Sequence, residues 1–285
     1  MNPEQEIRNS GHEPKINNKT LELFYRKRGD GGEPLIILHG LYGSGDNWMS
    51  IAQVLKEHFQ VYLIDQRNHG RSPHSDEMNY ELLSEDLHAF FQTHHIGKAN
   101  IIGHSMGGKT AMWFALKYPE LVNRLVVVDI APKTYNMSNA NFSTHRMIIS
   151  ALKGAEPETA NGRKEIEKRL LNVIPNRQLC MFLLKNIERN SAGKYLWRIN
   201  INSIEQNLPK IMDGFSDLAK DGIMPISTHT LFIKGELSNY INADDITEIR
   251  NLFPKAELVT FPDAGHWLHA QQPELFLKTV EDFLM

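Results

Sequence analysis

Short apolar runs that alternate with helical patterns constrain the fold of this chain more than any other feature. Each run has four residues, is almost wholly apolar, and is typical of a strand buried on both faces. In the first half of the chain the runs occupy residues 35–38, 61–64, 99–102 and 125–128, with helical patterns at 48–58, 80–95 and 106–118. Strands and helices that alternate in this way form a parallel sheet covered by helices. We therefore predict an α/β fold with a mostly parallel sheet.

The alternation of strands and helices stops after the fourth run. Residues 133–223 show helical periodicity without a convincing buried strand, and we expect a helix break at Pro209. The strand pattern and a final helix then follow at residues 230–233, 258–261 and 273–284. We predict a core built from residues 1–132 and 224–285, with residues 133–223 inserted into it as a helical cap.

Composition and charge exclude several classes of function. The chain has 285 residues, 31 of them basic and 34 acidic, and a net charge of -3 gives no attraction to a nucleic-acid backbone. Its single cysteine, Cys180, cannot form an intramolecular disulfide. Neither a secretory leader nor a run of about 18 apolar residues is evident. We predict a cytoplasmic protein without a membrane span that acts on a small molecule and not on nucleic acid.

One pentapeptide, Gly103-His104-Ser105-Met106-Gly107, follows a predicted strand and opens a predicted helix. This is the context of the G-x-S-x-G turn, which presents a serine hydroxyl at the edge of the sheet. Glycines two positions to either side of the serine let the backbones of strand and helix pass closely. The pattern therefore predicts Ser105 as a catalytic nucleophile.

Residues 103–110 also match G-x-x-x-x-G-K-[ST], the phosphate-binding loop of nucleotide hydrolases. Asp129, at the end of the next predicted strand, would then be a magnesium ligand. This interpretation gives no role to His39-Gly40, to the loop at Asp65 or to Gly265-His266. We keep nucleotide hydrolysis as the alternative hypothesis.

The histidine best placed to activate Ser105 is His266, which lies beyond the last predicted strand. A loop at the carboxyl edge of the sheet can bring its imidazole beside the serine. A serine hydroxyl is a weak nucleophile, and a hydrogen-bonded general base raises the rate by about 10² to 10⁴. We predict a Ser/His pair and assign a packing role to the neighbouring His104. No spacing of histidines indicates a metal site.

With these residues the chain resembles the α/β-hydrolase-fold esterases, and within them the bacterial YbfF-type esterases. The serine precedes the histidine, which is the order of this fold. The resemblance extends from about Thr20 to the C-terminus, apart from the predicted cap, and is carried by residues 39–44, 65–72, 103–112, 128–132 and 265–266. It implies hydrolysis of a carboxylic ester or acyl thioester through an acyl-enzyme on Ser105, without cofactor or metal. A non-catalytic, ligand-binding relative of the same fold is a further alternative.

The resemblance also assigns an oxyanion hole. The backbone N–H groups of Leu41 and Met106 would bind the developing negative charge, since one donor follows His-Gly and the other follows the nucleophile. Each such donor stabilises the transition state by roughly 3 to 4 kcal/mol. His39 and Gly40 would support the loop that carries the first donor.

The acid of the predicted triad has two candidates. The fold usually places it after the penultimate strand, where residues 235–240 of this chain contain no aspartate. The YbfF-type esterases keep their acid at the position of Asp129, and Ser238 would then be free to hydrogen-bond to it. Glu236 is the alternative acid.

The predicted cap must lie outside the carboxyl ends of the strands, where ligands of open α/β sheets bind. We therefore expect it to set substrate choice and to contribute no catalytic group. Among its apolar side chains we single out Phe182 and Trp197 as candidates for lining an acyl pocket.

Overall fold

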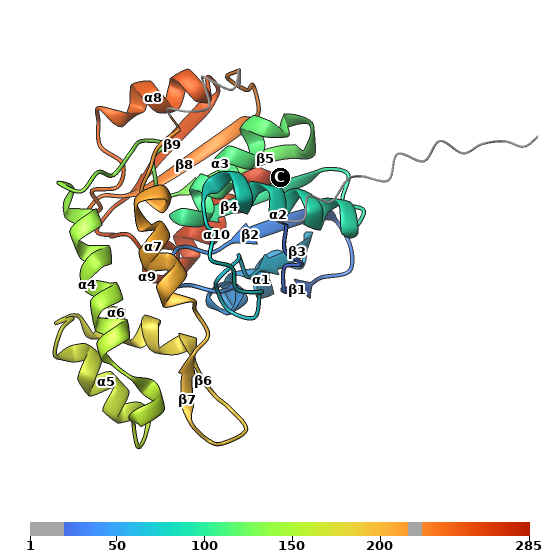
Figure 1. Ribbon diagram of the computed structural model, residues 1–285. Coiled ribbons are helices and arrows are strands. Elements are labelled where there is room, and N and C mark those ends of the chain that lie inside the picture. The colour runs from blue at the N-terminus through green and yellow to red at the C-terminus, as the bar shows by residue number, and fades with distance from the viewer. Residues whose placement is uncertain (1–19, 216–223) are drawn as a thin grey trace, which may run out of the picture.

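The computed structural model describes residues 20–215 and 224–285; the start of the predicted core (1–19) and the end of the predicted cap (216–223) lie outside them. A seven-stranded sheet with the order β1-β3-β2-β4-β5-β8-β9 forms its centre (Figure 1). Its strands are β1 (Tyr25–Arg28), β2 (Glu33–Leu38), β3 (Phe59–Ile64), β4 (Ala99–His104), β5 (Val122–Val128), β8 (His229–Gly235) and β9 (Ala256–Phe261). Strand β1 is antiparallel to β3, and the other neighbouring pairs are parallel. The predicted α/β fold with a mostly parallel sheet is confirmed.

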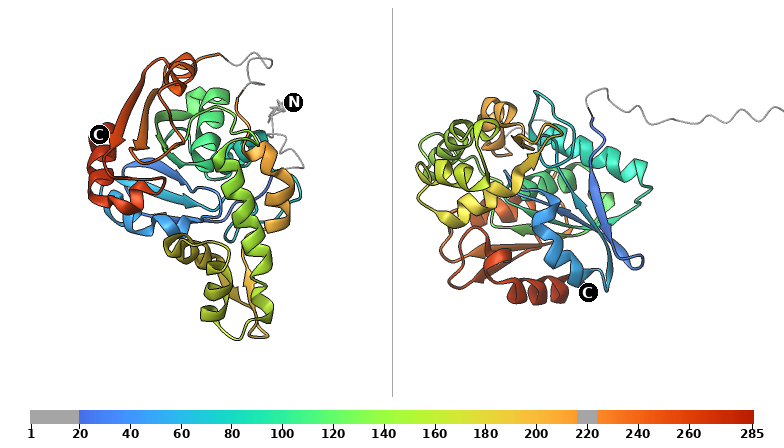
Figure 2. Two further views of the ribbon diagram at one scale, coloured as in Figure 1. Left: turned by 90° about the vertical axis from the view of Figure 1, so that its left-hand side faces the viewer. Right: turned by 90° about the horizontal axis from the view of Figure 1, so that it is seen from below.

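Helices cover both faces of the sheet, which explains why its strands read as continuous apolar runs. Alternate residues of β2 enter two separate cores: Ile36 and Leu38 pack with α2 and α3, whereas Leu35 and Ile37 pack with α1 and α10. Figure 2 shows α1 in blue beside α10 in red. The helices of the two faces are α1 (Met49–Leu55), α2 (Tyr80–Thr93), α3 (Met106–Lys117), α8 (Asp245–Leu252), α9 (Leu268–Gln271) and α10 (Pro273–Leu284), with short 3-10 turns at Gly45–Trp48 and Pro119–Leu121.

The chain between β5 and β8 leaves the sheet and forms a separate group of elements, at the left of Figure 1. These elements are α4 (Ala140–Gly154), α5 (Arg163–Leu171), α6 (Arg177–Leu183), the hairpin of β6 (Ile187–Arg189) and β7 (Tyr195–Trp197), and α7 (Ile201–Ile211), with 3-10 turns at Pro157–Thr159 and Leu184–Asn186. None of the described helices is both long and apolar enough to cross a membrane.

Two details of this segment differ from the sequence-based expectation. The hairpin was not expected, because strands of three residues are too short to show a pattern of alternation. Helix α7 does not break at Pro209 but contains it and ends two residues later, at Ile211. A proline so near the end of a helix removes one hydrogen bond without disturbing a long following stretch.

The two ends of the segment lie side by side on the core. The Tyr135 N–H donates to the Met212 carbonyl at 2.7 Å. The buried Lys109 ammonium, on α3, donates to the backbone carbonyls of both Lys133 and Asp213. Burial lowers the pKa of Lys109 to about 7. One side chain of the nucleophile helix therefore holds the entry and the exit of the segment.

Candidate active site

A strained strand-to-helix turn carries Ser105. Strand β4 ends at His104 and α3 begins at Met106, while Ser105 between them has φ 54° and ψ -118°, outside the regions that residues with a Cβ normally adopt. The flanking glycines make the close crossing possible, since a Cβ on Gly103 would lie 2.3 Å from the Gly107 carbonyl oxygen. Strain of this kind is concentrated at functional sites.

The imidazole of His266, in the loop after β9, lies between Ser105 and Asp129. Its Nε2 is 3.0 Å from the Ser105 Oγ, and its Nδ1 is 2.8 Å from the Asp129 Oδ2. Because an ionised carboxylate only accepts hydrogen bonds, Nδ1 carries the ring proton and donates to Asp129. Nε2 is then free to accept the serine proton. The structure brings these three predicted residues together in the order hydroxyl, imidazole, carboxylate.

The carboxylate of Asp129 is fully buried and has a hydrogen-bond partner on each oxygen besides the imidazole. The Gly235 N–H donates to Oδ1 at 3.0 Å, and the Ser238 hydroxyl donates to Oδ2. Glu236, the alternative acid, has no hydrogen bond to the imidazole, and its Oε2 accepts the Asp263 N–H at 3.0 Å. The structure thus places Ser238, which the family resemblance assigned to support of Asp129, within hydrogen-bond reach of that carboxylate.

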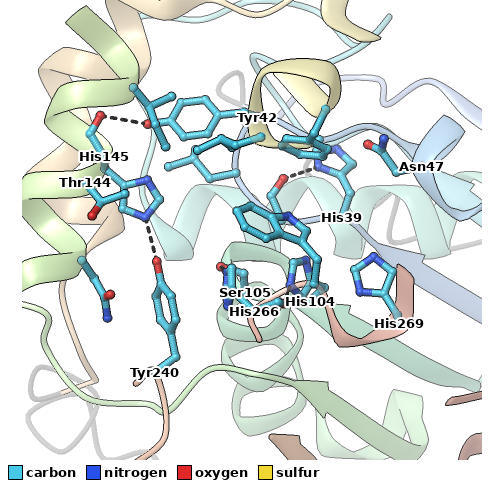
Figure 3. Close-up of a pocket in the computed structure, with 18 of the residues that line it drawn as sticks. His39, Tyr42, Asn47, His104, Ser105, Thr144, His145, Tyr240, His266 and His269 are labelled. Atoms are coloured by element: carbon cyan, nitrogen blue, oxygen red, sulfur yellow. Dashed lines mark hydrogen bonds between the residues drawn. The ribbon is translucent and has the colours of Figure 1, made fainter. Parts of the chain in front are cut away.

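Two further side chains hold His266 in place (Figure 3). The Tyr240 ring stacks on the imidazole with centroids 3.9 Å apart and planes inclined by 20°. The His104 Nε2–H donates to the His266 carbonyl at 2.8 Å. Sequence reasoning missed Tyr240 and gave His104 only a packing role. No local pattern could have found either contact, because each joins separate loops of the fold.

The predicted oxyanion donors, Leu41 and Met106, lie next to the serine. Both line a small cavity that Ser105 also lines, and within the described residues neither backbone N–H has a hydrogen-bond acceptor. Gly40 brings this loop close, since a Cβ there would lie 3.2 Å from the Ser105 Cβ and 2.8 Å from the His104 Nδ1.

His39 supports the loop and does not approach the serine. Its Nε2 accepts the Gln66 N–H at 3.0 Å, so its Nδ1 carries the proton and donates to the Gly40 carbonyl at 2.9 Å. Burial lowers the pKa of His39 to about 4, which keeps the ring neutral near pH 7. Both ring nitrogens are therefore occupied in holding the backbone.

A cavity of about 180 Å³ opens beside Ser105 and His266 (Figure 3). The core contributes one wall through Leu41, Tyr42 and Trp267, and the segment between β5 and β8 contributes the other. That second wall consists of Asn141, Thr144, His145, Ile148, Leu179 and Phe182. The cavity is mainly apolar and has room for part of a small acyl ester.

Only one of the two residues singled out in the cap borders this cavity. Phe182 lines it, with its ring centroid 5.9 Å from that of Trp267. Trp197 does not line it, and its indole Nε1–H donates to the Leu152 carbonyl at 3.0 Å, within the same segment. The expectation that Trp197 contacts the substrate is not supported by this position.

The phosphate-binding alternative does not fit this geometry. The Lys109 ammonium is buried and donates to two backbone carbonyls, so it is not free for a phosphate. The Thr110 hydroxyl is 2.8 Å from the Gln66 Oε1, which accepts its hydrogen bond. In the described part of the chain, no group of three or more His, Cys, Asp or Glu side chains is arranged to hold a metal ion.

Comparisons with known proteins show the family to which the chain belongs. The family described as alpha/beta hydrolase fold matches residues 33–273. The sn-1-specific diacylglycerol lipase ABHD11 of Danio rerio is 41% identical over 270 residues, which cover 94% of this chain and 82% of the relative. Esterase YbfF of Escherichia coli is 30% identical over 252 residues, covering 88% and 92% of the two chains. A solved structure titled marine microorganism esterase superposes with a TM-score of 0.89 at 58% identity, covering 93% of this chain and all of the other.

Proposed function

We propose, since this chain belongs to the alpha/beta hydrolase fold family, that it is a serine hydrolase that forms an acyl-enzyme on Ser105. Several of its relatives are named esterases or lipases, and the chain is an ester hydrolase. The substrate is a carboxylic ester or acyl thioester. The observation that carries the proposal is the line of contacts from the Ser105 Oγ through His266 to Asp129, beside an apolar cavity.

In the first half of the reaction, the Ser105 Oγ attacks the substrate carbonyl while His266 Nε2 takes its proton. The negative oxygen of the tetrahedral intermediate is stabilised by the N–H groups of Leu41 and Met106. Asp129 holds the imidazole in the required tautomer and stabilises its charged form. The imidazolium then gives its proton to the departing alcohol or thiol, which leaves an acyl ester on the serine.

In the second half, the same groups act on water. His266 Nε2 removes a proton from a water molecule as its oxygen attacks the acyl carbonyl, and the intermediate is again stabilised at the oxyanion hole. Collapse of that intermediate returns the proton to the Ser105 Oγ and releases the carboxylic acid. The site requires no cofactor for either half.

The segment 133–223 acts in this proposal as a cap that selects the substrate. Its support is the cavity wall, because α4 and α6 provide Ile148, Leu179 and Phe182 opposite the serine. The reacting groups Ser105 and His266 belong to the core elements. The core therefore supplies the chemistry, and the cap supplies the apolar surface that the substrate contacts.

Labelling with a small fluorophosphonate tests the nucleophile. We expect one equivalent of label on the wild type, none on Ser105→Ala, and normal labelling of Ser143→Ala, which changes an exposed serine of α4. Turnover of 4-nitrophenyl esters should disappear only in Ser105→Ala. Labelling that persists in Ser105→Ala would refute the acyl-enzyme on this residue. Calorimetric titration with Mg-ATP should give no binding heat, whereas the nucleotide-hydrolase alternative requires it.

A further inference from the structure

One face of α4 places two unpaired polar groups in the wall of the active-site cavity. Asn141, Thr144, His145 and Ile148 all line that cavity. Asn141 and His145 are only 6% and 9% exposed, yet the Asn141 Nδ2 and the His145 Nδ1 have no hydrogen-bond partner among the described residues. Buried polar groups are nearly always paired, because an unpaired one destabilises the fold. Two of them four residues apart on one helix face indicate a partner that arrives with the substrate.

The contacts of His145 decide which of its nitrogens carries the proton. Its Nε2 lies 3.2 Å from the Tyr240 hydroxyl, and Figure 3 shows these two side chains pointing toward each other. This is the one hydrogen bond of that hydroxyl within the described residues. We take the phenol to donate and Nε2 to accept, because in the opposite arrangement the phenol proton would have no acceptor among these residues. Burial raises the pKa of Tyr240, which keeps its proton on the oxygen. The ring proton of His145 therefore lies on the free Nδ1.

The two unpaired groups, the Asn141 Nδ2 and the His145 Nδ1, are therefore uncharged hydrogen-bond donors. Burial lowers the pKa of His145 to about 3, so its imidazole is neutral near pH 7. The Asn141 Nδ2 belongs to an amide, which donates through this atom and does not accept. The described residues that line the cavity include no lysine or arginine. A carboxylate held here would be buried without a counter-charge, which is costly, whereas a neutral oxygen would not.

We propose that the Asn141 Nδ2 and the His145 Nδ1 bind a second, uncharged oxygen of the substrate, distinct from the oxygen of the reacting carbonyl. The inference rests on the proposed esterase function and narrows its substrate class. The reacting carbonyl oxygen is already directed to the Leu41 and Met106 amides. The preferred substrates are therefore esters that carry a further ketone, ester carbonyl, ether or hydroxyl oxygen in the part that contacts α4.

Matched ester pairs test this class, because the two esters of a pair differ only at one carbon, which is a ketone carbonyl in one ester and saturated in the other. In the acyl series, 4-nitrophenyl 4-oxopentanoate is compared with 4-nitrophenyl pentanoate and with the 4-nitrophenyl monoester of succinic acid, which carries a carboxylate. In the alcohol series, acetonyl butyrate is compared with isobutyl butyrate. The quantity measured is the ratio of kcat/KM for the oxygen-bearing ester to that for its apolar partner. Comparing this ratio between variants cancels the intrinsic reactivity of each ester.

Asn141→Leu removes the donor and keeps the branching at Cγ, and His145→Gln removes the Nδ1 donor while keeping a side chain that can bond to Tyr240. In at least one series we expect each variant to lower the ratio by about three- to tenfold, as loss of one neutral hydrogen bond does. Asn141→Asp should lower it as well, because the new carboxylate cannot donate. Thr144→Val is the matched control on the same cavity wall: its hydroxyl already donates to the Ala140 carbonyl at 3.0 Å, so the ratio should stay at the wild-type value.

Labelling of Ser105 by a small fluorophosphonate separates the possible failures. If Asn141→Leu and His145→Gln label normally and their kcat/KM ratios equal the wild-type ratios in both series, the second-oxygen site is wrong while the esterase function stands. A preference of the wild type for the succinate monoester over the ketone would also overturn the neutral class. If the wild type neither labels nor cleaves any ester, the proposed function itself fails. Should Asn141→Leu not fold, His145→Gln and Asn141→Asp decide.

Discussion

At the scale of single residues, Asp129 has the environment of a buried carboxylate that is fixed in one orientation. It has a positive φ of 51°, and the Gly235 N–H, the Ser238 hydroxyl and the His266 Nδ1–H all donate to its carboxylate. Three donors on one buried carboxylate give its oxygens the hydrogen-bond partners that burial would otherwise remove. The same contacts fix the direction in which the carboxylate meets the imidazole.

We expect Asp129→Asn to lower kcat by about 10³ to 10⁴, because an amide at this position favours the wrong tautomer of His266. Glu236→Gln should change kcat by less than a few fold, since that carboxylate bonds to the Asp263 amide and not to the imidazole. Steady-state kinetics on one 4-nitrophenyl ester, with the double variant alongside, compare the two. A large loss in Glu236→Gln and a small one in Asp129→Asn would transfer the acid to Glu236.

The sequence predicts these residues unequally well. Ser105 is predictable because the turn requires glycines at fixed spacing, and His266 because it follows the last strand at the same sheet edge. Spacing alone does not distinguish Asp129 from Glu236, and only the resemblance favoured the former. Tyr240 and His145 could not be predicted, because their contacts join loops and helices from distant parts of the chain.

At the scale of elements, α6 sets one boundary of the cavity through Phe182, while the hairpin stays outside it. The Phe182 ring lies against Trp267, so its removal opens space beside the serine. Trp197, on β7, belongs to the same segment but bonds to the carbonyl of Leu152 on α4. The two aromatic residues therefore provide a test and its control.

Phe182→Ala should shift the preferred acyl chain to greater length, because the space left by the ring can accept further methylene groups at about 0.8 kcal/mol each. Trp197→Ala should lower stability and leave the length preference unchanged. The measurement is kcat/KM over 4-nitrophenyl esters from acetate to decanoate, with fluorophosphonate labelling as a check on Ser105. A shift in the tryptophan variant alone would mean that the cavity is bounded differently.

Helix positions in the segment 133–223 were easier to predict than its fold. Helical periodicity follows from side chains that face the core of the segment, such as Ile204 and Leu208 of α7, which are buried. The hairpin and the path of the chain depend on contacts between elements, including the Asn200 N–H bond to the Asn68 carbonyl at 2.9 Å. Periodicity carries no information about such contacts.

At the scale of the whole molecule, burial of neutral histidines couples folding to pH. Burial lowers the pKa of His39 to about 4 and of His69, His145 and His269 to about 3, and it also lowers the pKa of His104. In the unfolded chain their pKa is about 6.5. Between these values the unfolded chain binds more protons than the folded one. The free energy of unfolding therefore falls as the pH is lowered from about 6.5 toward 4.

Urea unfolding at pH 7, 6 and 5 should show this loss, with each such histidine contributing up to about 1.4 kcal/mol per pH unit. His269→Phe should reduce the slope of the unfolding free energy against pH by the contribution of one histidine. The variant lacks the imidazole whose ring centroid lies 4.2 Å from that of Trp48. His58→Gln changes an exposed histidine and should leave the slope as it is. A free energy of unfolding that is constant from pH 7 to pH 5 would contradict the neutral burial of these rings.

The hydrogen bonds from Lys109 to the two ends of the segment have a consequence for how enzymes of this architecture can diversify. Because Tyr135 and Met212 are hydrogen-bonded neighbours, the whole intervening stretch enters and leaves the catalytic unit at one point. The Lys109 ammonium donates to main-chain carbonyls. Because every amino acid has a main-chain carbonyl, the same side chain can bind the ends of an insert with an unrelated sequence. The gene segment that encodes this insert can thus be replaced by another whose encoded ends lie close together. The catalytic residues of the core then stay the same while the substrate specificity changes.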